Sequence, residues 1–238
     1  MQVKKKSLES PLARQDRAIR TRRLFLEAAA EVFNECGYDA ASISAILDRT
    51  ELTRGALYFH FTSKEELARG VLAEAVTSEG LVPQTLKLQE WVDVGLLLAY
   101  RLPREPMLSA SIRLAVDPKA RGLFGTRWPD WIVLGRDMIA EARARGEVHA
   151  HVDPAVTSRL FVGSWTGVQL VSGSLDESPQ LVDEIAALLE LVLPSIAVPG
   201  VLAQLDTSPG RAERLLAASR AAAEDRGPRS ADGPPTGR

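Results

Sequence analysis

Cysteine is almost absent from this sequence of 238 residues, because Cys36 is the only one. A single thiol cannot build a disulfide framework and suits a reducing compartment, and we expect Cys36 to be packed and unreactive at a helix end. No apolar run approaches the roughly 20 residues of a membrane-spanning helix. No apolar stretch follows Lys4–Lys6, as it would in a signal peptide. The sequence therefore predicts a soluble, cytoplasmic protein that does not enter a membrane.

The motifs of catalytic and cofactor sites are also missing. Gly163–Gly167 reads GSWTG, in which serine is second and not central as in the G-x-S-x-G elbow of hydrolases. His149 and His151 stand two apart without a cluster of further ligands, which is weak for a metal site. No glycine loop that cradles phosphate occurs. We therefore expect a protein that is not an enzyme and that has neither a cofactor nor a metal.

Charge of either sign is not in excess, but it is unevenly spread. The chain has 29 Lys and Arg against 31 Asp and Glu, a formal net charge of −2. Residues 1–23 carry a net charge of +6, since only Glu9 and Asp16 oppose Lys4, Lys5, Lys6, Arg14, Arg17, Arg20, Arg22 and Arg23. A basic end on an acidic body is typical of a polyanion-binding head joined to a regulatory domain. The alternatives are a solvated, disordered end for residues 1–10 and a solvated helix face for residues 17–23.

The stretch from Ser42 to Glu66 has the layout of a helix-turn-helix reader of DNA. Ser42, Thr53 and Ser63 are good N-cap residues for three successive helices. Glu66 follows Ser63 by three residues, which is the spacing of a capping box. Two short helices joined by a tight turn, followed by a longer helix, are therefore expected here.

Helical periodicity covers most of the remaining chain. A first helix is expected from near Gln15 to Gly37, where glycine accepts the left-handed conformation that ends helices. Asp153-Pro154 and Ser178-Pro179 each give a polar N-cap followed by proline at the first helical position. Later helices are expected at about 85–102, 105–116, 128–145, 154–173, 179–197 and, weakly packed, 211–224, with a loop at 122–128. No segment alternates in hydrophobicity as strands do, so the predicted fold class is all-α.

Residues 20–67, RTRRLFLEAAAEVFNECGYDAASISAILDRTELTRGALYFHFTSKEEL, resemble the DNA-binding region of the tetracycline-repressor (TetR) family. GALYFHF-x-SKEELA is similar to the γ-butyrolactone autoregulator receptors of that family. A weaker likeness continues through WVDVGLLLAYRL, DMIAEARARGEVHAHVDP, FVGSWTGVQLVSGS and LVLPSIAVPGVLAQLD, so the resemblance covers about residues 14–206. It implies a homodimeric repressor that binds double-stranded operator DNA and is released by a small lactone-type signal. Pseudo-receptors of the same subgroup answer antibiotics, other hydrophobic molecules or none, and the sequence does not separate these alternatives.

The sequence and the resemblance together predict five segments. They are a flexible basic arm (1–14), a helix-turn-helix DNA-binding domain (15–62), a connecting helix (63–79), a ligand-binding and dimerisation domain (80–206), and a weakly helical, then disordered tail (207–238).

The helix-turn-helix departs from the family pattern at two residues. The turn reads Thr50-Glu51-Leu52, where the family usually has Ala-Gly-Val or similar. If Glu51 took the left-handed conformation, the loss of glycine would cost on the order of 1 kcal/mol. Arg54 stands where the family most often has lysine; it keeps the charge and adds a fork suited to guanine or phosphate.

The recognition helix is short, so it can present only a few side chains to DNA. Arg54 is the candidate for base contact, and Gly55 lets the helix backbone approach closely. Tyr58, His60 and Lys64 are placed for phosphates. The other candidates for DNA contact are Arg17, Arg20, Arg22, Ser42, Ser44 and Thr53. As alternatives, Tyr58 and His60 would pack between helices, as we expect for Phe59 and Phe61, and Ser42 and Thr53 would act only as caps.

The ligand-binding candidates lie in the second half of the chain. Trp131 begins an apolar stripe with Leu134 and Met138, which by itself favours core packing. Its distance from Gly146-Glu147 resembles that of the tryptophan that lies against the lactone in butyrolactone receptors. Thr166 and Gln169 could supply polar groups to an apolar cavity, or could be satisfied buried groups.

The dimer-interface candidates follow from the family's four-helix interface. Gly163 and Gly167 recur at i and i+4, which permits close approach of helices. The full set is Gly163, Gly167, Ile185, Leu188, Leu189 and Val192. The alternative is packing within one chain.

Overall fold

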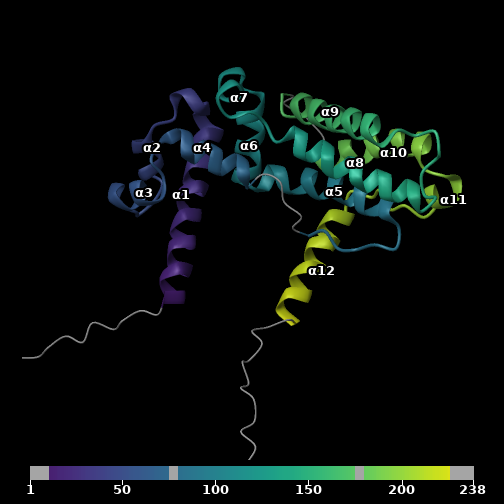
Figure 1. The fold of residues 1–238 in the computed structure, drawn as a ribbon, viewed down its shortest axis with the longest axis horizontal. Coiled ribbons are helices and arrows are strands. Elements are labelled where there is room, and N and C mark those ends of the chain that lie inside the picture. Colours follow the sequence, from purple (N-terminus) through teal and green to yellow (C-terminus); the bar gives the residue numbers. More distant parts are fainter. Residues whose placement is uncertain (1–10, 75–79, 175–179, 226–238) are drawn as a thin grey trace, which may run out of the picture. The chain divides into compact units, whose positions relative to one another are not determined.

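The computed structural model describes residues 11–74, 80–174 and 180–225 of the chain. This part of the chain contains twelve α-helices and no strand beyond an isolated bridge between Val148 and Ala197. The predicted all-α fold is therefore confirmed. The helices form two compact units with boundaries near residues 78, 101 and 129. Unit one holds α1–α4, α6 and α7, and unit two holds α5 and α8–α12 (Figure 1).

Unit one is built on a long first helix. Its helices are α1 (Pro11–Ala40), α2 (Ile43–Leu47), α3 (Arg54–His60), α4 (Lys64–Ala73), α6 (Pro106–Val116) and α7 (Pro118–Phe124), with a 3₁₀ turn at Leu102–Arg104. Its core contains the fully buried side chains of Phe25, Phe33, Ile46, Leu57 and Leu67. Phe25 and Phe33 lie on α1, and α2, α3 and α4 contribute one each of the other three, so each helix buries one face in a shared core.

The first helix corrects two expectations. It begins at Pro11 and not near Gln15, so residues 11–14 are not part of a flexible arm; proline is tolerated at a first helical position because its missing N–H needs no partner there. Residues 1–10 lie outside the described part. Gly37 interrupts the helix with a φ of 76°, as predicted. Cys36, expected to be packed, is exposed, although its thiol donates to the carbonyl of Val32.

Residues 102–129 fold with unit one, whereas the expected boundaries placed them in the domain from residue 80 to 206. The physical reason is burial: Ala110 and Leu114 of α6 and Ala120 of α7 are enclosed in the core that α1 and α4 line. The expected loop at 122–128 is also wrong in part, since α7 is helical to Phe124. Its N-cap is Asp117, whose carboxylate accepts from the amide of Ala120 at 2.7 Å.

Unit two is organised around one central helix. Its helices are α5 (Lys87–Arg101), α8 (Trp128–Ala144), α9 (Pro154–Ser172), α10 (Leu181–Ile196), α11 (Pro199–Leu202) and α12 (Arg211–Asp225). α5 is buried along most of its length and contacts both α10 and α12. Asp153 caps α9 as predicted, accepting from two backbone amides. The predicted Ser178-Pro179 cap lies outside the described residues.

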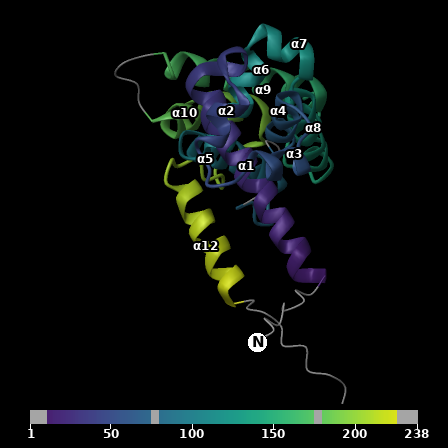
Figure 2. The ribbon, with the colours of Figure 1, turned by 90° about the vertical axis from the view of Figure 1, so that its left-hand side faces the viewer.

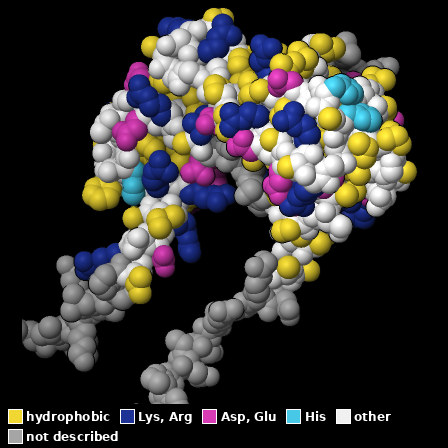
Figure 3. Space-filling view, turned by 45° about the vertical axis from the view of Figure 1, so that its right-hand side comes forward, with side chains coloured by type: hydrophobic (Ala, Val, Ile, Leu, Met, Phe, Trp, Pro, Cys, Tyr) yellow, Lys and Arg dark blue, Asp and Glu magenta, His cyan; other side chains and the backbone are white. Residues whose placement is uncertain are grey.

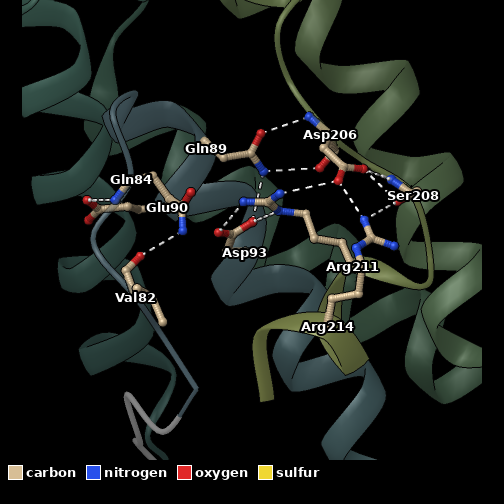
Figure 4. Close-up of polar contacts among 9 residues, drawn as sticks. All are labelled: Val82, Gln84, Gln89, Glu90, Asp93, Asp206, Ser208, Arg211 and Arg214. Atoms are coloured by element: carbon tan, nitrogen blue, oxygen red, sulfur yellow. Dashed lines mark hydrogen bonds and ion pairs between the residues drawn. The ribbon is translucent and has the colours of Figure 1, made fainter. Parts of the chain in front are cut away.

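The last helix is anchored more firmly than the weakly helical tail that the sequence predicts. α12 begins beside α5, and its second half extends away from the other helices of unit two (Figure 2). Arg211 forms a two-pronged ion pair with Asp93 of α5, with Nη2 2.9 Å from Oδ2, and Asp93 is fully buried. Gln89 joins the same network by donating to Asp93 and to the carbonyl of Asp206 (Figure 4). Ala212, Leu215 and Leu216 are buried beside it.

One carboxyl group of this network, that of Asp206, has a shifted pKa. Burial alone would raise the pKa of Asp206, but hydrogen bonds from Ser208 and the guanidinium of Arg211 lower it to about 2 from an ordinary 3.8. A carboxyl group whose pKa is lower in the folded state than in the unfolded state stabilises the fold at pH values above its unfolded pKa. This contribution is therefore present above about pH 4 and is lost as the pH falls toward 2.

Candidate nucleic-acid interface

The three predicted helix starts around the helix-turn-helix are confirmed. Ser42 Oγ accepts from the amide of Ala45 at 3.1 Å, and Thr53 Oγ1 accepts from that of Ala56 at 3.2 Å. Ser63 Oγ accepts from the amide of Glu66 at 3.2 Å. Each hydroxyl thus satisfies an amide that the first turn of its helix leaves without a partner.

The capping box after the recognition helix is displaced by one residue. Glu66 accepts from the backbone amide of Thr62 at 2.7 Å and from its hydroxyl at 2.8 Å, and not from the amide of Ser63. These two bonds hold the pKa of Glu66 below its ordinary value. The carboxylate therefore fixes the corner where α3 ends and α4 begins.

The turn between α2 and α3 is not strained by the loss of glycine. No described residue other than glycine has a positive φ, so Glu51 does not take the left-handed conformation, and the expected cost of about 1 kcal/mol does not arise. The hydroxyl of Thr50 instead holds the turn, donating to the carbonyl of Leu47 and accepting from the amide of Leu52 at 3.1 Å. Glu51 itself is exposed.

The recognition helix α3 presents one face to solvent. Arg54, Gly55 and Tyr58 are exposed there. Phe59 corrects an expectation: it was predicted to pack between helices but is 82% exposed, whereas Phe61 is buried as predicted. The reason is helical spacing, because Leu57 and Phe61 share the core face at i and i+4 and Phe59 lies on the opposite side.

His60 and the basic residues of α1 differ in how far they are buried. The His60 ring is half-buried between the rings of Phe25 and Phe59, so packing accounts for part of its role. The guanidinium of Arg22 lies 5.2 Å from the ring centre of Phe61, a cation–π contact. Arg17 and Arg20 are exposed, as is Ser44 at the start of α2. Lys and Arg side chains lie along the projecting part of α1 among hydrophobic ones (Figure 3).

Lys64, predicted to contact phosphate, is committed within the protein. Its ammonium donates to the carbonyls of Tyr38 and Ala41 at 2.8 Å each and lies 4.3 Å from the ring centre of Tyr38. The Tyr38 hydroxyl donates to Glu65, and burial together with that carboxylate raises the pKa of Tyr38 to about 12. Lys64 therefore holds the corner between α1 and α2.

Replacing Lys64 with Met should lower the free energy of unfolding by about 2–4 kcal/mol, because two charge-assisted hydrogen bonds to half-buried carbonyls are lost. Urea unfolding followed by circular dichroism measures the loss. The matched control is Lys119→Met, since Lys119 pairs with Asp39 at the surface with 65% of its side chain exposed, and should change stability by less than about 1 kcal/mol. If the Lys64 variant is as stable as the original protein and its DNA affinity depends less on salt, then Lys64 contacts phosphate and does not stabilise the fold.

The ligand-binding candidates all lie in unit two, in different surroundings. Trp131 is half-buried in the first turns of α8, with Met138 buried below it. The hydroxyl of Thr166 donates to the carbonyl of Val162 at 2.8 Å, so this group is already satisfied. Gln169 Oε1 is buried and accepts no hydrogen bond from any described residue, which leaves it available to a donor.

The dimer candidates divide into two groups. Gly163 and Gly167 face open space, since an added Cβ would meet no atom within 4 Å, and Leu188 and Val192 are partly exposed. Ile185 and Leu189 are fully buried, so packing within the chain accounts for them. These two lie one helical turn apart, and Ile185 faces Gly95 of α5. Sequence reasoning did not single out the exposed apolar residues of these two helices, which are Val156, Leu160, Leu170 and Val171 of α9 and Leu191 of α10.

None of the helices in the described ranges is long and apolar enough to cross a bilayer. The same ranges contain no group of three or more His, Cys, Asp or Glu side chains placed to hold a metal ion.

Comparison with known proteins places the chain beside bacterial regulators. The tetR family of bacterial regulatory proteins matches residues 25–71. The A-factor receptor protein of Streptomyces griseus is 39% identical over 214 residues, which make up 90% of this chain and 76% of that protein.

Solved structures agree with this placement. Full-length native TylP, a TetR regulator from Streptomyces fradiae, matches with a TM-score of 0.79 at 39% identity, over 85% of this chain and 99% of TylP. A γ-butyrolactone receptor described as ArpA-like matches with a TM-score of 0.64 over 87% of this chain and 99% of that one. At 22% identity, that second likeness is one of fold alone.

Proposed function

This chain belongs to the tetR family of bacterial regulatory proteins, and we propose that it represses transcription as a homodimer on a palindromic operator and is released by a γ-butyrolactone-type signal. It is a transcriptional regulator and not an enzyme. The observation that carries the DNA-binding part is the outward face of α3, where Arg54, Gly55, Tyr58 and Phe59 are exposed on a helix fixed at both ends by caps.

Direct base reading would fall to Arg54, at the first position of α3. Its guanidinium can donate two parallel hydrogen bonds to O6 and N7 of guanine. Gly55 beside it removes a side chain from the surface that approaches DNA. Phe59 adds an apolar contact for a thymine methyl group, and Tyr58 is placed for a phosphate. Arg17 and Arg20 on α1 add charge without sequence preference.

A dimer is required because one seven-residue helix reads few base pairs. Two recognition helices related by a twofold axis read two half-sites of a palindrome, and linking them multiplies their affinities. The uncovered face around Gly163 and Gly167 supports α9 as part of the interface.

Ligand release would follow from two dimer states with different spacing of the recognition helices, of which the signal binds one more tightly. Trp131 offers an amphipathic ring that can cover an acyl chain. The unused carbonyl of Gln169 offers an acceptor to a hydroxyl group of the signal. The 39% identity to the A-factor receptor protein supports a lactone as the ligand class.

The experiment begins with selection of binding sites from random duplexes, followed by thermal shift against γ-butyrolactones, butenolides and antibiotics. A lactone that raises the melting temperature and dissociates the selected duplex supports the proposal. Release by antibiotics alone, or by none of the panel, would identify a pseudo-receptor instead. Failure to enrich any duplex contradicts repression at an operator altogether.

Arg54→Ala should reduce the preference for the selected operator over random DNA by about 5–150-fold, the effect of about 1–3 kcal/mol for a lost bidentate base contact. Arg54→Lys is the matched variant, because it keeps the charge and removes the fork. It should retain affinity for random DNA and lose part of the preference. Fluorescence anisotropy with both duplexes measures the ratio. If the alanine variant discriminates as well as the original protein, Arg54 does not read a base.

A further inference from the structure

Two histidines that the proposed regulator does not use lie side by side on unit two. The ring centres of His149 and His151 are 5.4 Å apart, and the planes of the rings differ by only 21°. His149 is half-buried and His151 is exposed, and Figure 3 shows two neighbouring histidine side chains at the surface. The two-residue spacing in the sequence is by itself weak evidence for a metal site. The structure adds that the two rings lie together where water reaches them.

The backbone holds the two histidines in one tight turn. The amide of Val152 donates to the carbonyl of His149 at 3.1 Å, which closes the turn. The amide of His149 donates to the carbonyl of Ile196 at 2.9 Å. Val148 pairs with Ala197 in the isolated bridge, so the turn is fastened to the end of α10. The rings therefore project from an ordered backbone, and a ligand bound between them would restrict little further backbone freedom.

The ring nitrogens of both histidines are available to a ligand. Neither imidazole forms a hydrogen bond or an ion pair with any described residue, and the ring that each contacts is the other histidine. A neutral imidazole has one nitrogen lone pair. That lone pair is a common ligand of zinc, copper and nickel ions in proteins. The turn thus presents two such nitrogens that no described residue uses.

The distance between the rings suits two ligands of one ion. A histidine nitrogen lies about 2.1 Å from a bound zinc ion, and the centre of its ring lies about 1.2 Å beyond the nitrogen. Two rings that meet one ion at a tetrahedral angle of about 110° therefore have centres about 5.4 Å apart. This is the separation observed here. Because the rings are nearly parallel, a rotation about χ2, which is a soft torsion in histidine, directs one nitrogen of each ring at the same point.

The charged groups around the turn favour an ion held by nitrogen over one held by carboxylates. Asp153 accepts from two amides at the start of α9, and Glu147 accepts from two amides at the start of α5. The guanidinium of Arg143 donates to the carbonyl of Val152 at 2.9 Å, which places a positive charge beside the turn. No set of three metal-ligating side chains occurs in the described ranges. Magnesium and calcium ions, which need several oxygen ligands, are therefore not expected to bind here.

We propose that His149 and His151 chelate one transition-metal ion of the Cu²⁺, Ni²⁺ and Zn²⁺ class, with water completing its coordination. Cu²⁺ should bind most tightly of the three, because nitrogen ligands follow this order of affinity. The ion would hold the turn that joins α8 to α9 beside the end of α10, so it should raise the melting temperature of the protein. The site lies apart from α3 and does not depend on the proposed repression.

Titration calorimetry with Ni²⁺ on the full-length, untagged protein tests the site. Cys36→Ser is present in every sample, because the exposed thiol of Cys36 could also bind these metals. One Ni²⁺ per chain is expected, whereas Mg²⁺ should give no binding. With Cu²⁺, electron paramagnetic resonance should show coupling to two nitrogen ligands.

His149→Gln and His151→Gln should each weaken Ni²⁺ binding by about 100-fold, because each leaves a single ligand and removes the gain from binding at two points. His60→Gln changes the remaining histidine of the chain, which lies in unit one, and should leave the nickel affinity unchanged. Circular dichroism should be the same for all variants, since the two rings of the turn bond to no other described residue. Equal Ni²⁺ binding by the double variant His149→Gln/His151→Gln, or no binding by the parent protein at 1 mM Ni²⁺ or about that concentration, overturns the proposal.

Discussion

Arg211→Met is expected to lower the free energy of unfolding by about 3–5 kcal/mol, because it leaves one partner of a buried ion pair without the other. Asp93 has no exposed surface and receives two bonds from Arg211, whose side chain is only 15% exposed. The amide of Gln89 is the only other side-chain donor to Asp93 in the hydrogen bonds described (Figure 4). Methionine fills similar volume, so the loss reports the uncompensated charge and not a cavity.

Urea unfolding followed by tryptophan fluorescence reports mainly on unit two, because three of the four tryptophans, Trp91, Trp131 and Trp165, lie there. Arg214→Met is the control: Arg214 pairs with Asp206 but is 60% exposed, so its loss should cost less than about 1 kcal/mol. Adding Asp93→Leu to Arg211→Met should recover most of the stability, since an apolar pair can replace a buried ion pair. If the double variant is no more stable than the single one, the buried charge is not the source of the cost.

Local signals in the sequence predicted what is decided locally. The caps at Ser42, Thr53 and Ser63 are formed because a hydroxyl and the amide three residues later meet in any helix start. The exposure of Phe59 is also decided locally, although the sequence analysis wrongly expected this side chain to pack between helices. The spacing from Leu57 to Phe61 already placed it on the other side of α3.

Contacts between distant residues were not predictable in the same way. Lys64 looked like a free cation at a helix start, and only the folded chain shows that it holds the carbonyls of residues 38 and 41. Arg211 and Asp93 are separated by 118 residues, so nothing near either one announces the pair. In α10 the sequence is apolar on two faces, and hydrophobicity alone does not tell which face meets the chain's own core. Ile185, which faces Gly95 of α5, and Leu189 are fully buried, while Leu191 is exposed.

Gly163→Leu is expected to lower affinity for a palindromic duplex by about 100-fold or more, because it removes the second half-site from intramolecular reach. An added Cβ at Gly163 meets nothing within 4 Å in the single chain, so the protomer has room for the new side chain. Replacing glycine inside a helix should even stabilise the protomer by about 0.5–1 kcal/mol. The same side chain would separate two helices that need the absent Cβ to approach each other. A more stable protomer with a weaker dimer is a combination that general damage to the fold does not produce.

The control for Gly163→Leu is Gly122→Leu, a glycine in α7 of unit one that also has open space around it. This variant should gain similar helix stability while keeping both the dimer and the affinity for the palindrome. Sedimentation velocity gives the mass, and anisotropy on the palindrome and on a single half-site gives the two affinities. Affinity for the half-site should be unchanged in Gly163→Leu, because α3 and its caps lie in the other unit. If Gly163→Leu remains a dimer of wild-type strength, the open face of α9 is not where the two copies meet.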